Sequence, residues 1–321
     1  MEHLTTDELR RIQRTLRTRY RIGTRSNLLD VGFGAALKAG KFQPGRRLCI
    51  TFLVRKKKNV RKVTDRIPPK VHVRLKRGKR FVNLSFSTDV VEVGGIVAAG
   101  RTLDYRTKTV TTGVIVAWKA SSRSRYSWGV VTVGHVFPRL RTLSRLRRKV
   151  TIRTNRGKFF GTLVAKSDGD REIDAAIAQV KRQDLVAKRL MTASQSARRI
   201  EPRMVTTLAS DQNKSGQTLR VGGKRRFTVH AYFPSLRVPS LGAIDHIVSV
   251  FSGAAQTFQP GTSGSGWLIQ NQAACLQIAG RMPDFKQGFG QSLNSVAEWA
   301  AKVLAKQQRM HLGSFRIVAT F

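Results

Sequence analysis

The sequence predicts a mostly β protein with two successive antiparallel β units, an N-terminal α+β extension and a C-terminal helix. From about residue 110 onward, short apolar or alternating runs follow one another closely, separated by turn residues and without helical spacers. This pattern is typical of an antiparallel barrel or sandwich, and it occurs on both sides of a polar, basic stretch over 181–202. Helical periodicity marks the two ends of the chain.

The N-terminal part predicts a helix over 1–22 and a leader domain over 23–109. We expect Thr6 to cap the helix, because Asp7 and Glu8 would then lie in its first turn and basic residues in its later turns. The predicted strands of the leader are 28–34, 48–54, 71–75 and 89–93.

The first β unit is expected over 110–190 and the second over 191–321. Strands of the first unit are predicted at 114–118, 128–133, 150–153, 159–164 and 173–180. Those of the second are predicted at 204–208, 218–221, 227–233, 244–251, 267–269 and 275–279. A closing helix over 292–306 has its apolar residues on one face, and 315–318 could add an edge strand.

The charge of the chain sets its predicted partners. Among 321 residues, 60 Lys and Arg face 18 Asp and Glu, which gives a formal net charge of +42. Such a chain should attract polyanions such as nucleic acid in a salt-dependent way; the alternative is a general basic composition spread over a solvated surface. With no run of about 18 apolar residues, no secretory signal and two widely spaced cysteines, we expect no transmembrane helix and a cytoplasmic location.

Three residues stand out as candidates for chemistry. His135 ends an apolar strand beside a glycine, where a rigid, desolvated imidazole can act as a general base; alternatively it caps a strand or fills a corner of the core. Asp174 opens an apolar run, and a buried carboxylate needs a partner such as an imidazole N–H. Ser263 lies among glycines that let successive N–H groups point at one place, although most Gly/Ser turns are only turns.

Asp168, Asp170 and Glu172 precede Asp174 and favour a solvated turn. Alternating acids can bind calcium, but the glycine and the distal glutamate of an EF-hand loop are missing here. The sequence therefore predicts no metal site and no cofactor.

The segments 132–135 (Thr-Val-Gly-His), 174–176 (Asp-Ala-Ala) and 261–266 (Gly-Thr-Ser-Gly-Ser-Gly) resemble the three motifs of trypsin-like serine peptidases, in the same chain order. Motifs within 31–34, 49–57, 66–69 and 88–94 look like the leader of intracellular bacterial trypsin-like proteins related to the plant Narrow leaf type. The resemblance implies a chymotrypsin-like fold, a double six-stranded antiparallel β-barrel. It also implies peptide hydrolysis through an acyl-enzyme.

The resemblance implies that Ser263 is the nucleophile, His135 the general base and acid, and Asp174 the orienting carboxylate. The N–H groups of Gly261 and Ser263 would form the oxyanion hole. Thr262 replaces the acid that pairs with a newly cut amino terminus in secreted members, so activation by trimming is not expected. The substrate pocket would be lined by Thr257, Gln277, Ile278, Ala279 and Gly280, with no acid to favour cleavage after Arg or Lys.

The alternative is a catalytically idle scaffold that binds nucleic acid or another polyanion. Its predicted patch follows the histidine strand and contains Arg139, Arg141, Arg145, Arg147, Arg148 and Lys149. A third possibility is an esterase-like acyl transferase using the same triad. The predicted partners are therefore a protein or peptide substrate and, for the alternative, a polyanion; the sequence predicts no oligomeric state.

Overall fold

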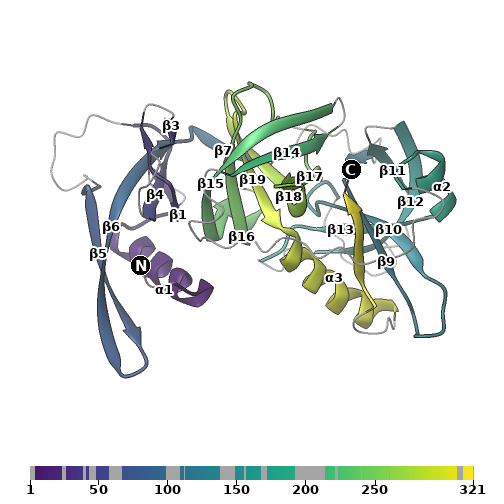
Figure 1. Cartoon of the computed structure of the whole chain (residues 1–321), viewed down its shortest axis with the longest axis horizontal. Coiled ribbons are helices and arrows are strands. Elements are labelled where there is room, and N and C mark those ends of the chain that lie inside the picture. Colours follow the sequence, from purple (N-terminus) through teal and green to yellow (C-terminus); the bar gives the residue numbers. More distant parts are fainter. Residues whose placement is uncertain are drawn as a thin grey trace.

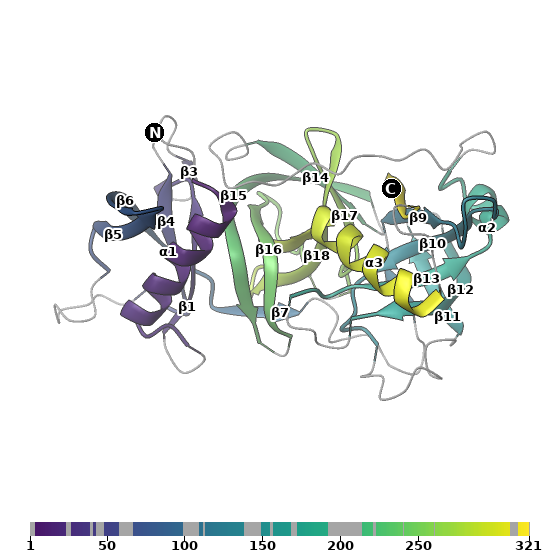
Figure 2. The same ribbon diagram turned by 90° about the horizontal axis from the view of Figure 1, so that it is seen from below.

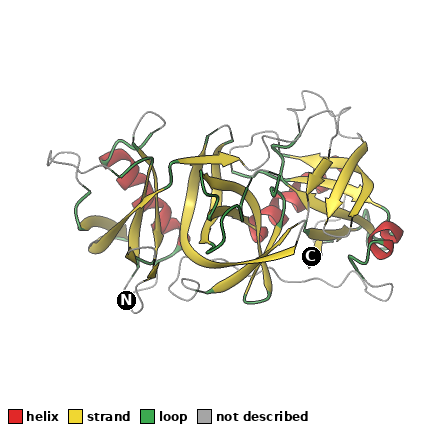
Figure 3. Ribbon diagram, turned by 90° about the horizontal axis from the view of Figure 1, so that it is seen from above, coloured by secondary structure: helices red, strands yellow, loops and turns green. Residues whose placement is uncertain are grey.

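The computed structural model describes residues 4–23, 27–38, 41–42, 48–57, 67–98, 109–111, 113–137, 149–154, 157–167, 172–191, 214–220, 223–239, 241–259, 261–308 and 314–320. Three units lie in a row along the longest axis of the molecule (Figure 1). The leader is at one end and the first β unit at the other, with the second β unit between them. Strands dominate all three units, and helices are few (Figure 3).

The leader consists of a helix packed on a small sheet. Its elements are α1 (Thr6–Arg19), β1 (Leu28–Gly34), β2 (Leu37–Lys38), β3 (Lys41–Phe42), β4 (Cys49–Val54), β5 (Lys70–Arg77) and β6 (Arg80–Glu92). Thr5, and not the predicted Thr6, caps α1: its hydroxyl accepts from the N–H of Glu8, whose carboxylate accepts from the N–H of Thr5. Leu9, Ile12 and Leu16 on the buried face of α1 pack against β1, β4 and β5.

The second β unit is a closed six-stranded antiparallel barrel. Its strands are β14 (Ser215–Arg220), β15 (Gly223–Val238), β16 (Gly242–Phe251), β17 (Gly266–Ile269), β18 (Gln272–Met282) and β19 (Gln287–Ser292). They pair in the order β14-β17-β18-β19-β16-β15, and β15 pairs with β14 to close the ring. The long β15 also pairs with β1, and β7 (Gly95–Ala98) pairs with β18, so the leader sheet continues into the barrel.

The first β unit is a seven-stranded sheet. Its elements are β8 (Thr109–Thr111), β9 (Val114–Trp118), β10 (Ser127–Thr132), β11 (Lys149–Thr154), β12 (Gly157–Lys166), β13 (Ala176–Val180) and α2 (Arg182–Ala187). The strand order is β20-β9-β10-β13-β12-β11-β8, in which β20 (Arg316–Thr320) comes from the end of the chain. Between β19 and β20, α3 (Leu293–Gln308) runs from the barrel toward this sheet (Figure 2).

One apolar core joins the two β units. Val114 and Val131 of the first unit, Phe233 and Phe289 of the barrel and Leu293 of α3 belong to the same buried cluster. The two units are therefore packed against each other without an intervening polar layer at this point, and residues at their junction are held rigidly.

The predicted fold class is confirmed, with the two β units, the α+β extension and the C-terminal helix in the expected order. The predicted edge strand joins the first unit, which therefore has seven strands. Neither β19 nor the outer half of β6 is among the predicted strands, because the glycines of β19 give no strand pattern and the outer half of β6 is polar. The strand predicted at 204–208 lies outside the described residues.

Within the described part of the chain, no helix has the length and apolar character needed to span a membrane.

Candidate active site

Ends of three strands bring the three candidate residues together. His135 follows β10 and Asp174 precedes β13, and these strands are antiparallel neighbours with Thr132 opposite Ala176. In an antiparallel pair, the end of one strand lies beside the start of the next, so a residue just after β10 and a residue just before β13 are neighbours. Ser263 precedes β17 of the barrel and meets them across the junction of the two units.

The carboxylate of Asp174 holds His135 at two points. Oδ2 lies 2.5 Å from His135 Nδ1, and Oδ1 accepts from the backbone N–H of His135 at 2.8 Å. Both side chains are largely buried, with 8% and 6% of their surfaces exposed. An ionised carboxylate only accepts hydrogen bonds, so the ring proton belongs on Nδ1 and the lone pair on Nε2.

The Nε2 atom faces the hydroxyl of Ser263. The Oγ atom lies 3.3 Å from Nε2, and the residue is 2% exposed. This distance is near the upper end of hydrogen-bond reach, as expected where a serine and its base tighten only around a substrate. The three side chains therefore form one line of polar contacts: carboxylate, imidazole and hydroxyl.

The turn that carries Ser263 is held by the first β unit. The hydroxyl of Thr111 donates to the carbonyl of Gly261 at 3.0 Å, and Thr132 donates to the carbonyl of Thr111 at 2.6 Å. Gly264 has φ +89°, and a Cβ there would collide with the carbonyl oxygen of Thr111. Only glycine fits this position, because a side chain would meet both the backbone strain and the clash.

In the serine turn, the N–H groups on either side of Ser263 donate to backbone carbonyls. Thr262 N donates to Gln259 O at 3.2 Å, and Gly264 N donates to Gln277 O at 2.9 Å. Among the described residues, the N–H groups of Gly261 and Ser263 have no acceptor. Two free N–H donors beside a candidate nucleophile are what an oxyanion requires.

Thr262 joins a neutral network beneath the serine. Its hydroxyl donates to Gln259 O at 2.6 Å and accepts from Gln277 Nε2 at 2.5 Å. Gln277 Oε1 in turn accepts from the indole N–H of Trp267 at 3.4 Å. The turn is thus supported by uncharged groups at the place where the resembled family has an acid.

Gln291 of the barrel, which is not among the predicted site residues, holds the segment that carries the candidate carboxylate. Its Oε1 accepts from the backbone N–H of Asp174 at 3.1 Å, and its Nε2 donates to the carbonyl of Glu172 at 2.8 Å. The N–H of Asp245 also donates to Glu172 O, at 2.9 Å. A single glutamine in a glycine-rich stretch gives no signal of this role, because its partners lie far away in the sequence.

Gly134 keeps the space beside His135 free. A Cβ at this position would lie 2.7 Å from Ser167 Oγ and 3.1 Å from Asp174 Oδ1. Ser167 Oγ also accepts from the N–H of Ala175 at 3.1 Å. A larger residue before the histidine would therefore push apart the groups that hold the carboxylate.

The residues predicted to line a substrate pocket are all buried: Thr257, Gln277, Ile278, Ala279 and Gly280. Thr257 donates within its own turn, to Ser252 Oγ at 3.0 Å and Ala254 O at 2.8 Å. The side chain of Gln277 donates to the hydroxyl of Thr262 in the serine turn. Their role in substrate binding stays a prediction.

Most of the predicted polyanion patch falls outside the described residues: Arg139, Arg141, Arg145, Arg147 and Arg148. Lys149 is exposed, with Nζ 4.4 Å from the centroid of the Phe160 ring. Asp168 and Asp170 of the acidic turn also fall outside it. In the part of the chain that the structure describes, no three His, Cys, Asp or Glu residues gather as metal ligands would.

Proteases are found among the solved structures that resemble the chain. Thermobifida fusca protease A is 14% identical with a TM-score of 0.39, covering 66% of this chain and 99% of that one. Nocardiopsis protease is 14% identical with a TM-score of 0.37, covering 65% and 98%. Cellulomonas bogoriensis chymotrypsin is 16% identical with a TM-score of 0.36, covering 70% and 96%.

All three TM-scores lie below 0.5, and none of the three proteases is more than 16% identical to this chain. No protein-family model and no curated protein matches the chain.

Proposed function

We propose that the protein is a serine endopeptidase that cleaves peptide bonds through an acyl-enzyme formed on Ser263. The observation that carries the proposal is the line of contacts from Asp174 through His135 to Ser263 Oγ, at 2.5 Å and 3.3 Å. A buried serine hydroxyl facing the free nitrogen of an imidazole, whose other nitrogen is held by a carboxylate, is the arrangement that activates serine as a nucleophile.

The first step uses this line directly. Ser263 Oγ attacks the carbonyl carbon of the substrate while its proton passes to His135 Nε2. The resulting imidazolium keeps its Nδ1–H on Asp174, which stabilises the positive charge without taking the proton. His135 then protonates the leaving amine, and water, deprotonated at the same nitrogen, releases the acyl group in the reverse order.

The negative charge that develops on the carbonyl oxygen needs its own donors. The N–H groups of Gly261 and Ser263, unbound within the described residues, are the proposed pair. Loss of one such donor typically lowers kcat by about 10²–10³. The substrate is proposed to be a protein or peptide; the cytoplasmic location and the relation of the leader to the plant type stay predictions from the sequence.

A fluorophosphonate probe tests the proposal, because it reacts only with an activated serine. We expect one adduct by intact-protein mass spectrometry, located at Ser263 by peptide mapping and lost in Ser263→Ala. Ser265→Ala is the matched control: this serine is also buried, and its Oγ has no hydrogen-bond partner among the described residues. It should therefore keep both fold and labelling.

Absence of an adduct in the folded wild-type protein would contradict the proposal, as would labelling that persists in Ser263→Ala. The first result would favour the idle scaffold, and the second would indicate a reactive residue other than Ser263. Hydrolysis of a peptide library by the labelling-competent protein, but not by Ser263→Ala, then distinguishes a peptidase from an esterase with the same site.

A further inference from the structure

A two-stranded hairpin projects from the leader, away from both β units (Figure 1). It is formed by β5 and β6, which pair from Lys70 opposite Ser87 to Arg77 opposite Arg80 and turn at Gly78 and Lys79. β5 is the last strand of its sheet, so one side of the hairpin is an edge.

The two faces of the hairpin differ completely. Val71, Val73 and Leu75 point inward and are buried against α1. The intervening residues of β5 are all exposed and mostly cationic: Lys70, His72, Arg74 and Lys76. Opposite them on β6 lie small polar or aromatic side chains: Ser87, Ser85, Asn83 and Phe81. We call these eight residues the outer face.

The outer face carries several cations and no acidic residue. Residues 67–88 contain no Asp or Glu, and Asp89 follows where β6 begins to pair with β4. Arg77 is bound to Glu8 at 2.7 Å, but among the described residues no acid pairs with Lys70, Arg74 or Lys76. Side chains two residues apart on one strand are spaced by roughly 6.7 Å, so Arg74 and Lys76 are neighbours along the outer face and Lys70 lies two such steps from Arg74.

Phe81 is the second unusual feature of this face. It is 56% exposed, and the guanidinium of Arg74 lies over it with Cζ 4.2 Å from the ring centroid. The stacking holds the cation in place while leaving its N–H groups free to bind. The Phe81 ring is therefore largely exposed on a mostly polar ribbon, and its contact with Arg74 lies on the surface.

We propose that the outer face binds double-stranded DNA, with the ribbon lying in the major groove. The groove, about 12 Å wide, admits a two-stranded ribbon. In this orientation Lys70, Arg74 and Lys76 reach the phosphates, while Asn83 and Phe81 face base edges, as amide and apolar side chains do in the groove. The major groove of duplex RNA is too deep and narrow for side chains to read, so DNA is the expected partner.

A simpler explanation of the cations is protection of the edge strand, because charged side chains on an edge discourage pairing with other chains. The two explanations differ in whether the sign of the side-chain charge matters. Edge protection needs charge of either sign, whereas phosphate binding needs positive charge. Reversing the charges therefore preserves the first and abolishes the second.

The test uses the full chain with Lys70→Glu, Arg74→Glu and Lys76→Glu combined, and a fluorescent 20-base-pair DNA duplex followed by anisotropy. We expect the affinity to fall by at least about 10-fold at low salt. The dependence of log K on log salt concentration should become shallower by about 3, one for each lost phosphate contact. Unchanged size-exclusion and thermal unfolding profiles show that the variant is folded and monodisperse.

The control carries three reversals at exposed lysines beside or within α2 and α3: Lys181→Glu, Lys302→Glu and Lys306→Glu. It has the same net charge as the hairpin variant, so we expect its affinity and salt slope to stay close to wild type. Equal loss in both variants would overturn the proposal, since binding would then follow net charge alone. Equal or tighter binding of an RNA duplex, or no DNA binding at low salt, would overturn it as well.

Discussion

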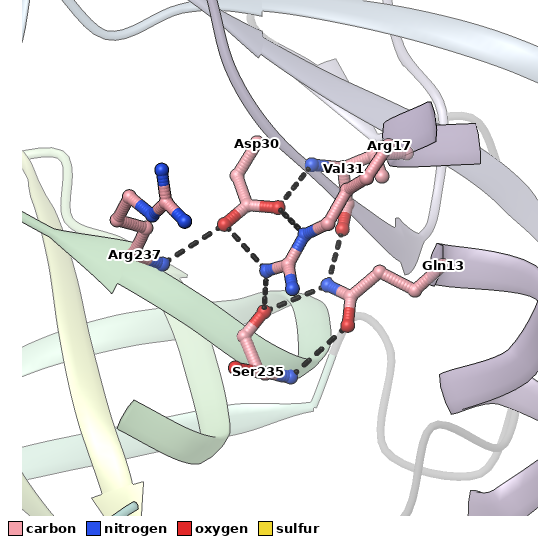
Figure 4. A network of polar contacts seen from close by, with 6 residues as sticks. All are labelled: Gln13, Arg17, Asp30, Val31, Ser235 and Arg237. Atoms are coloured by element: carbon pink, nitrogen blue, oxygen red, sulfur yellow. Dashed lines mark hydrogen bonds and ion pairs between the residues drawn. The ribbon is translucent and has the colours of Figure 1, made fainter. Parts of the chain in front are cut away.

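Two buried carboxylates show how this chain uses the same physical constraint for different purposes. Asp30 of β1 is 1% exposed and lies where the leader meets the barrel. It accepts from Arg17 Nε and Nη2 at 2.9 and 2.8 Å, and from the N–H groups of Val31 and Arg237 at 2.8 and 2.9 Å (Figure 4). Asp174 is also buried, but its side chain is held by His135.

The two carboxylates are similarly buried and differ in the side chain that donates to them. The guanidinium of Arg17 never releases a proton, so Asp30 can only hold α1 and β15 together. An imidazole exchanges protons near neutral pH, and the one beside Asp174 has a hydroxyl on its far side. Because both carboxylates are buried, each needs a strong hydrogen-bond donor. Of the two donors, Arg17 and His135, only the imidazole of His135 can transfer a proton.

The junction around Asp30 is a docking site for α1. Gln13 Nε2 donates to the carbonyls of Val31 and Ser235, each at 2.7 Å, and its Oε1 accepts from Ser235 N at 3.2 Å. Arg17 Nη2 reaches the same carbonyl of Ser235 at 2.7 Å. Figure 4 shows these side chains converging from α1 on β1 and β15. Charged and amide groups of α1 thus fix the leader to the barrel at this junction, in addition to the β1–β15 and β7–β18 strand pairing.

Replacing each carboxylate by the matching amide gives the largest expected effect. In Asp174→Asn the amide no longer favours the Nδ1–H tautomer, and we expect the rate of fluorophosphonate labelling to fall by about 10⁴ with little change in stability. In Asp30→Asn the buried ion pair is broken, and we expect the free energy of unfolding to fall by about 3 kcal/mol. Labelling kinetics and urea unfolding, measured on both variants, separate the two effects.

If Asp30→Asn slowed labelling of the folded protein as much as Asp174→Asn did, the two sites would not be distinct. Labelling is therefore measured where unfolding curves show both variants to be fully folded. A large loss of stability in Asp174→Asn alone would also reverse the comparison.

How much of each site could be predicted follows from the range of its contacts. Asp174 opens an apolar run and His135 ends one, so each carries a local signal. Asp30 also lies in an apolar strand, but its partners come from a helix before it and from β15, far along the chain. Gln291 was missed for the same reason. The sequence patterns report what a strand buries, but not which distant backbone atoms a buried amide will reach.

A pair of buried glutamines provides the second prediction. Gln291→Leu removes the two side-chain hydrogen bonds from the barrel to 172–174 and leaves the bond from Asp245 N–H to Glu172 O, while Gln13→Leu removes the same kind of contacts from the leader junction. Each substitution takes a partner from backbone groups, at about 1–3 kcal/mol for a group left unpaired; Glu172 O keeps the N–H of Asp245, and Ser235 O keeps Arg17. We expect fluorophosphonate labelling to slow by about 10-fold in Gln291→Leu and to stay unchanged in Gln13→Leu. The labelling rates are compared under conditions in which the unfolding curve of each variant shows it to be folded.

Because Gln291 positions Asp174 through its backbone, the pH dependence of labelling should keep its midpoint while the plateau rate falls. A shift of the midpoint would indicate a direct effect on His135 instead. Slower labelling in Gln13→Leu would show that the two junctions are coupled.

The smallest expected effect concerns a histidine at the leader junction. His246 Nε2 lies 2.9 Å from Arg10 Nη2, and its Nδ1 lies 2.6 Å from the hydroxyl of Tyr232. Arg10 can only donate, so the neutral ring must carry its proton on Nδ1 and accept at Nε2. Burial, and then the charge of Arg10, lower the pKa of His246 below its usual value, although Asp245, Glu298 and Glu172 oppose the shift.

This lowered pKa sets the sign of a pH effect on stability. Below about pH 6.5 the unfolded chain binds a proton at this histidine before the folded chain does, so stability is complete above that pH and falls as the pH drops toward the folded pKa. The loss is at most about 1.4 kcal/mol per pH unit, and solvent screening at the partly exposed ring reduces it. His246→Asn should flatten this part of the profile, since Asn also tolerates the φ of +54° found here. Urea unfolding between pH 5 and 8 measures the free energy of unfolding of both proteins. Parallel profiles would show that His246 does not contribute to the pH dependence, and that Arg10 holds the leader by its charge alone.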